Sequence, residues 1–149
     1  MVGVEVGGVV KNVIAIVTGI SDGMGYGANT RSALITHGLA ELIRLATAMG
    51  GQLETCIGLS GLGDLILTCS DDQSRNRRLG LAIGKGRSIH EAEQEIGQVV
   101  EGKRNAELVN RLADRHDVDM PICKAVSAIL QGQLAAKEAI KEMLAIHSS

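Results

Sequence analysis

The chain has 149 residues, of which 45% are hydrophobic and 21% charged, and its formal net charge is −2. This size and composition are typical of one globular domain and exclude a disordered tail. The small negative charge and the single aromatic residue, Tyr26, argue against partners such as nucleic acid or an anionic membrane.

The sequence opens with an apolar run whose hydrophobic residues recur at helical spacing along residues 5–20. This pattern predicts a long helix that is buried on most sides. Charged and polar residues interrupt the run at Glu5, Lys11 and Asn12, so we do not expect it to cross a membrane.

Three glycines punctuate residues 22–29, and this segment is predicted to be a loop. A second long helix is expected over residues 30–49, because apolar residues again follow helical spacing and Gly50 and Gly51 can end the helix.

The rest of the chain is predicted as a series of shorter helices. They are expected over residues 53–57, 61–69 and 74–83, after a capping box at 88–91, over 106–116, from Pro121 onward, and over 136–146. Residues 99–102 are predicted to be a loop. The sequence therefore predicts an all-α fold of about eight helices, with residues 1–149 as a single helical domain.

The glycine-rich segment Gly23–Ala28 fits the GxGxxA pattern of dinucleotide-binding turns. However, the apolar run before it is too long for one strand, and Asp22 would place a carboxylate beside a pyrophosphate. No strand with a ribose-binding acid follows the second helix. A connector between helices is the favoured interpretation.

Lys11 is a candidate catalytic residue because it lies halfway along a helix that is otherwise rich in Val and Ile. Burial disfavours the charged ammonium, which turns a lysine into a proton donor and acceptor near neutral pH. Gly7 and Gly8 precede it by one turn and leave that face open to a substrate. From the pattern alone, a solvent-facing lysine is the simpler alternative.

Two further segments carry polar residues at predicted helix starts. The segment Gln73–Arg78 holds three arginines in a first helical turn, where amide N–H groups and guanidinium groups suit a phosphate. A solvated basic face, compensated by Asp71 and Asp72, explains it equally well. Asp64 either caps a helix or binds a substrate hydroxyl.

Cysteine and histidine spacing gives no sign of a metal site or a disulfide framework. The three cysteines include no CxxC pair, and the four histidines share no ligand spacing. We expect no metal and a reducing, cytoplasmic setting.

Several separated motifs together resemble one known family. The segments GVEVGGVVKNVIAI, SDGMGYGANTRSALI, GLSGLGDLILTC, SRNRRLG and GQVVEGKRN occur in the order and at the approximate spacing seen in bacterial-type NAD(P)-dependent glycerol-3-phosphate dehydrogenases. The resemblance covers nearly the whole chain but only the family's C-terminal substrate domain, which is helical and of the 6-phosphogluconate dehydrogenase C-terminal-like type. The family's N-terminal Rossmann domain is absent from these residues.

The resemblance implies roles for individual residues. Lys11 matches the catalytic, substrate-binding lysine, which gives a proton to the carbonyl oxygen of dihydroxyacetone phosphate and takes it back in the reverse reaction. Further substrate-binding positions match Asp64, Ser74, Arg75 and Asn76, and cofactor-binding positions match Arg75, Val99 and Glu101. On this basis we expect Lys11 to lie in a water-poor crevice.

The implied reaction interconverts sn-glycerol 3-phosphate and dihydroxyacetone phosphate with NAD or NADP, and it supplies glycerophospholipid synthesis. The chain alone is expected to be inactive, and a homodimer is expected. Two alternatives remain: a non-catalytic helical oligomerisation module, and the substrate domain of another two-domain dehydrogenase that acts on a 2-hydroxy compound.

Overall fold

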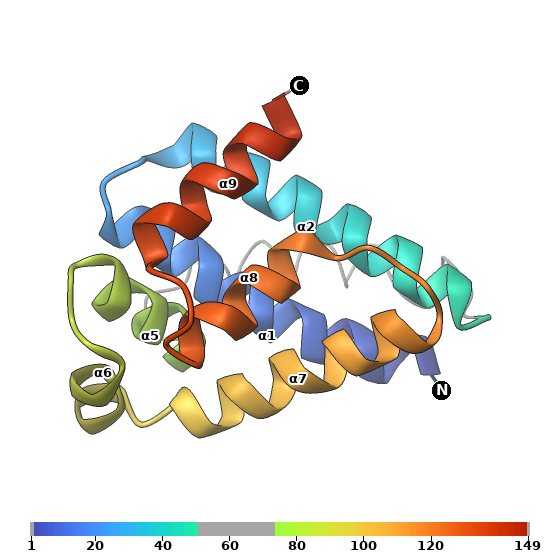
Figure 1. Ribbon diagram of the computed structural model, residues 1–149, viewed down its shortest axis with the longest axis horizontal. Helices are drawn as coiled ribbons and strands as arrows, with labels where there is room; N and C mark the ends of the chain where they lie inside the picture. The colour runs from blue at the N-terminus through green and yellow to red at the C-terminus, as the bar shows by residue number, and fades with distance from the viewer. Residues whose placement is uncertain (1, 51–73, 149) are drawn as a thin grey trace.

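The computed structural model describes residues 2–50 and 74–148, and within these ranges the protein is helical and contains no strand (Figure 1). The described helices are α1 (Val2–Gly23), α2 (Ala28–Ala48), α5 (Arg75–Gly84), α6 (Ile89–Ile96), α7 (Val99–Arg115), α8 (Pro121–Leu130) and α9 (Ala136–Ser148). The all-α prediction is confirmed. The helices expected over residues 53–57 and 61–69, and with them Asp64, lie outside the described residues.

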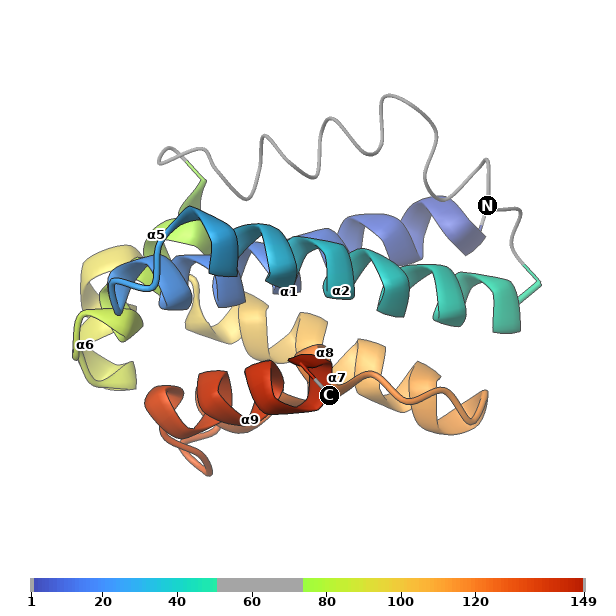
Figure 2. The same ribbon diagram turned by 90° about the horizontal axis from the view of Figure 1, so that it is seen from above.

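The apolar first helix, α1, forms the centre of the molecule. It contacts α2, α5, α7 and α8, and every residue from 13 to 20 is buried. Figure 2 shows α1 and α2 side by side in one layer, with α7, α8 and α9 in a second layer. The segment Val6–Gly23 is long and apolar enough to span a membrane, yet most of it is buried against other helices, as in the core helix of a globular protein.

Local sequence signals placed several helix ends correctly. Ser88 and Glu91 form the predicted capping box at the start of α6, and Pro121 occupies the first turn of α8. Ser74 caps α5 by accepting a hydrogen bond from the backbone N–H of Arg77 at 3.3 Å.

Two predicted loops are wrong in part. The loop expected over residues 22–29 is shorter, because α1 continues through Gly23 and α2 already begins at Ala28. The loop expected over residues 99–102 is instead the first turn of α7. There the Glu93 carboxylate accepts the backbone N–H of Val99 at 2.7 Å and so supplies a cap from outside the helix.

The helices α1 and α5 cross with their backbones in direct contact. Gly19 and Gly23 of α1 face Gly80 and Gly84 of α5, so each helix presents two glycines four residues apart. A Cβ atom at Gly80 would collide with the carbonyl oxygen of Ile16. Side chains at these positions would therefore force the helices apart.

This crossing fixes the register between the two helices. Because Gly19 lies against Gly80 and Gly23 against Gly84, α1 and α5 run parallel. One turn earlier, the same register brings the start of α5 toward residues 12–15 of α1. The glycine contacts thus hold the backbone of α5 from Arg77 onward.

Candidate anion site at the start of α5

The first turn of α5 presents polar groups that the rest of the described chain does not satisfy. Asn76 is only 8% exposed, and its side-chain Oδ1 has no hydrogen-bond partner among the described residues. The N–H groups of Arg75 and Asn76 have no acceptor within the helix, because they lie in its first turn. This helix start can therefore bind an anion or a polar ligand.

Arg75 connects this turn to the junction between α6 and α7. Its side chain is exposed, and its Nη2 donates a hydrogen bond to the carbonyl oxygen of Ile96 at 2.9 Å. Val99 is buried two residues beyond Gly97, whereas Glu101 is exposed and its carboxylate lies 3.4 Å from Arg104. Arg75, at the start of α5, thus lies beside the short junction that leads to Val99 and Glu101.

Lys11 lies on α1 and is half-buried. Gly8 stands one turn earlier on the same face of the helix, and a Cβ atom there would meet no atom of the described residues. Among the described residues, therefore, nothing packs against Gly8 on the face that it shares with Lys11. Whether Lys11 lies in a water-poor crevice stays a prediction.

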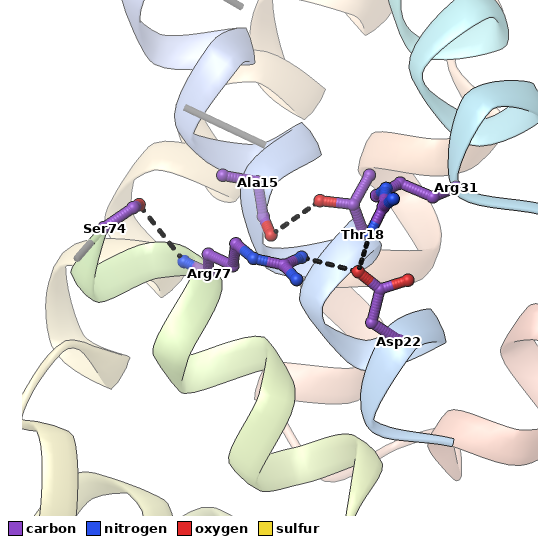
Figure 3. A network of polar contacts seen from close by, with 6 residues as sticks. All are labelled: Ala15, Thr18, Asp22, Arg31, Ser74 and Arg77. Atoms are coloured by element: carbon purple, nitrogen blue, oxygen red, sulfur yellow. Dashed lines mark hydrogen bonds and ion pairs between the residues drawn. The ribbon is translucent and has the colours of Figure 1, made fainter. Parts of the chain in front are cut away.

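The structure changes the interpretation of the arginines in this turn. Arg75 and Arg78 are exposed, but Arg77 is 6% exposed and points into the protein. Its Nη1 lies 2.8 Å from Oδ2 of Asp22, which also accepts a hydrogen bond from Arg31 at 2.7 Å (Figure 3). Arg77 therefore belongs neither to an exposed arginine cluster nor to a solvated basic face.

Sequence reasoning missed the pairing of Asp22 with Arg77, although a signal for it was present. Asp22 comes three residues after Gly19, and Arg77 comes three residues before Gly80. Residues three apart share a helix face, so both charges lie on the glycine faces that pack together. Opposite charges on two such faces are placed to form a buried pair.

A second group that sequence reasoning missed is Glu41, which is fully buried on α2. Its carboxylate accepts the backbone N–H groups of Ile122 at 2.8 Å and Cys123 at 3.3 Å, and so caps the start of α8. Burial raises the pKa of Glu41 to about 7, although these hydrogen bonds and Arg44 oppose the shift. Burial, and then Glu41, raises the pKa of the Cys123 thiol.

A cavity of about 570 Å³ opens elsewhere, among the C-terminal end of α5, the start of α6 and the start of α9. Its lining is mainly apolar, and it contains Met24, Ile83 and Ile89 but none of the predicted site residues. Volume alone would favour this cavity as a binding site. The unsatisfied polar groups at the start of α5 are stronger evidence for chemistry there.

The fold and this site define a helical domain in which the first turn of α5 carries N–H groups and a buried amide oxygen that the described residues do not satisfy. A family model described as "NAD-dependent glycerol-3-phosphate dehydrogenase C-terminus" matches residues 1–141. The chain belongs to this family.

Individual relatives agree with this assignment. The chain is 54% identical over 144 residues to "Glycerol-3-phosphate dehydrogenase [NAD(P)+]" of Legionella pneumophila (strain Corby), covering 97% of this chain and 44% of the relative. The protein of the same name from Photobacterium profundum is 56% identical, with 97% and 43% covered. The chain thus spans less than half the length of these relatives.

The same similarity holds for a solved structure. The crystal structure of glycerol-3-phosphate dehydrogenase from Coxiella burnetii matches with a TM-score of 0.90 and 53% identity, over 97% of this chain and 44% of that one. A family with this name handles a phosphorylated substrate, which is consistent with an anion site.

Proposed function

We propose that this chain forms the substrate-binding part of an NAD(P)-dependent glycerol-3-phosphate dehydrogenase, which interconverts sn-glycerol 3-phosphate and dihydroxyacetone phosphate. The main support is the start of α5, where the first N–H groups suit a phosphate and the buried, unpartnered Oδ1 of Asn76 can accept a hydrogen bond from a substrate hydroxyl. An unsatisfied buried amide is costly unless a ligand or water completes its hydrogen bonds.

The substrate phosphate is bound at the start of α5. The N–H groups of Arg75 and Asn76 and the positive end of the helix dipole favour an anion, and the exposed Arg75 guanidinium adds a charge. Ser74 supports this turn as its N-cap. By the same family resemblance, Asp64 contacts the substrate from outside the described residues.

Lys11 transfers the proton at the oxygen on C2 of the substrate. In reduction its ammonium donates a proton to the carbonyl oxygen, and in oxidation the amine accepts the proton from the hydroxyl. The described residues leave the face of Gly8 uncovered, which is consistent with a three-carbon substrate next to this side chain. A phosphate held at α5 then sets the distance between C2 and Lys11.

NAD or NADP, when bound, supplies the hydride donor or acceptor. The residues of this chain fit one edge of a cofactor site. The exposed Glu101 carboxylate can accept hydrogen bonds from hydroxyl groups, and the exposed Arg75 guanidinium can donate them. The N–H of Val99 is already bound to Glu93, so Val99 contributes packing rather than a hydrogen bond.

The wider assignments rest on this function. If the chain takes part in this reaction, we expect the enzyme to be cytoplasmic and to supply glycerophospholipid synthesis. We also expect it to form a homodimer. The chain alone is expected to show no turnover.

Replacing Lys11 tests the proposed reaction. We use a hybrid enzyme in which this chain replaces the matching part of the Legionella pneumophila relative. Lys11→Met should lower kcat for dihydroxyacetone phosphate by about 10²- to 10⁴-fold, the usual contribution of a general acid. The control is Lys124→Met, which removes an exposed lysine from α8 and should leave kcat unchanged.

The assay also separates the alternatives. An oligomerisation module predicts that Lys11→Met keeps near-normal turnover and that assembly, measured by light scattering, is lost. A dehydrogenase for another 2-hydroxy compound predicts turnover of substrates that lack a phosphate, whereas our proposal predicts that the unmodified hybrid rejects unphosphorylated glycerol.

A further inference from the structure

We propose that Asp22 and Arg77 are a positioning pair that holds the first turn of α5 in the geometry required to bind the substrate phosphate. This inference rests on the proposed function. It assigns a role in substrate binding to two residues that are not expected to touch the substrate.

The pair connects the binding turn to the central helix. Arg77 is the third residue of α5, its backbone N–H donates to the Ser74 cap, and its guanidinium lies 2.8 Å from Asp22 near the end of α1. Asp22 also binds Arg31 of α2, so one carboxylate joins three helices (Figure 3). Arg75 and Asn76, which lie between Ser74 and Arg77 in this turn, carry the N–H groups proposed to bind the phosphate.

Helix electrostatics make the pair necessary at this place. An arginine in the first turn of a helix is unfavourable, because the helix dipole is positive there. The Asp22 carboxylate offsets this repulsion and fixes the direction in which Arg77 leaves the helix. The side chains of Arg77 and Asp22 are only 7% and 11% exposed, so water screens the pair weakly.

The glycine crossing places the backbone of α5 only from Arg77 onward. Gly19 lies against the carbonyl oxygen of Arg77, and Gly80 and Gly84 hold the middle and the end of α5 against α1. The contact between the Arg77 side chain and Asp22 adds a second attachment at the same residue. Together, the backbone and side-chain contacts of Arg77 hold both the position and the direction of the helix start.

A pure charge effect and a positioning effect predict opposite results. Asp22, Arg31 and Arg77 together carry a net positive charge, so Asp22→Asn makes the region more positive. If charge alone mattered, this change would strengthen phosphate binding, and Arg31→Gln would weaken it. A positioning role predicts weaker binding for Asp22→Asn and little effect for Arg31→Gln, because the pair of Asp22 with Arg77 then remains.

The experiment measures steady-state kinetics of these variants in the hybrid enzyme, at a temperature where each variant is folded. Asp22→Asn should raise the KM for dihydroxyacetone phosphate about tenfold, as expected for the loss of a charged hydrogen bond of about 1.4 kcal/mol. The kcat should change less than about threefold, because the pair holds α5, whereas Lys11 lies on α1 about three turns before Asp22. Arg31→Gln should stay within about twofold of the unmodified KM.

A second variant covers the case in which Asp22→Asn does not fold. Arg77→Lys keeps the charge, but its shorter side chain weakens the contact with Asp22, so it should raise the same KM about threefold. Unchanged KM values in all folded variants, or a lower KM for Asp22→Asn, would overturn the positioning role. Failure of the proposed function is seen separately, because the unmodified hybrid would then not reduce dihydroxyacetone phosphate at all.

Discussion

The starts of α5 and α8 both carry first-turn N–H groups that have no acceptor within the helix, but their surroundings are opposite. At α8 the buried Glu41 carboxylate accepts the N–H groups of Ile122 and Cys123, and both residues are fully buried. At α5 the only described side-chain cap is Ser74, and Asn76 is left with an unpartnered Oδ1. One helix start is closed by the protein itself, whereas the other remains available to a ligand.

The difference depends on where the nearest carboxylate is directed. Asp22 is close to α5, but it binds the side chains of Arg31 and Arg77 rather than the N–H groups of the first turn. A carboxylate on those N–H groups would occupy the place of a substrate phosphate. The chain therefore uses Asp22 to hold the site without filling it.

The largest expected effect comes from closing the start of α5 with a carboxylate. Asn76→Asp places a carboxyl group at this helix start, as Glu41 of α2 does at the start of α8, and the negative charge of the aspartate should repel the substrate phosphate. In the hybrid enzyme, kcat/KM for dihydroxyacetone phosphate should fall at least about 10³-fold, which corresponds to about 4 kcal/mol. The helix dipole stabilises the new carboxylate, so the protein should stay folded.

The chain offers a matched control for this change. Asn29 occupies the same second position in α2 and is exposed, so Asn29→Asp makes the same substitution at a helix start without a proposed site. It should leave kcat/KM unchanged. If Asn76→Asp keeps its KM within a factor of about ten, the phosphate does not bind at the start of α5.

The next effect concerns the crossing that places α5 beside α1. Gly80→Ala puts a methyl group against the backbone of Ile16 and Ile20, which cannot rotate away as a side chain can. We expect it to lower the free energy of unfolding of this chain by about 3 kcal/mol, measured by urea denaturation.

Gly8→Ala is the control for this substitution, since Gly8 is a helical glycine of α1 with open space around it. It should raise the free energy of unfolding by about 0.5–1 kcal/mol, because alanine loses less backbone entropy on folding. Equal effects of the two substitutions would show that close contact at Gly80 does not hold the helices together.

Local signals explain which parts of the fold the sequence predicts. The Ser88 and Glu91 capping box and the Pro121 helix start each depend on residues within one turn, and the structure confirms them. The first turn of α7, residues 99–102, was predicted to be a loop, although it is helical. Gly102 makes room for side chains from α1, α5 and α8.

The parts of the site that sequence reasoning missed depend on distant partners. Glu41 caps a helix whose first N–H groups come 81 and 82 residues later in the chain. Asp22 and Arg77 meet only because four glycines bring α1 and α5 together. Residue types within one helical turn predict where an anion can bind. The partners of Asp22 and Glu41 depend instead on how distant helices pack together.

The smallest expected effect tests the closed helix start through its pH dependence. Burial raises the pKa of Glu41 from 4.5 to about 7, so the folded state holds a proton that the unfolded state has already released. Stability therefore falls as pH rises through this interval, by about 2–3 kcal/mol between about pH 5 and 8. Glu41→Gln should remove this slope in urea unfolding measured across the same range.

Glu91→Gln is the matched control, because Glu91 also serves a helix start but is exposed. Hydrogen bonds from Ser88 lower the pKa of Glu91, so its contribution is lost only when the pH falls through that lowered value. Glu91→Gln should thus shift the stability by the same amount at every pH from about 5 to 8 and keep the slope. If Glu41→Gln kept the slope as Glu91→Gln does, the Glu41 carboxyl group would not titrate between about pH 5 and 8. Glu41 would then be a permanent anion at the start of α8.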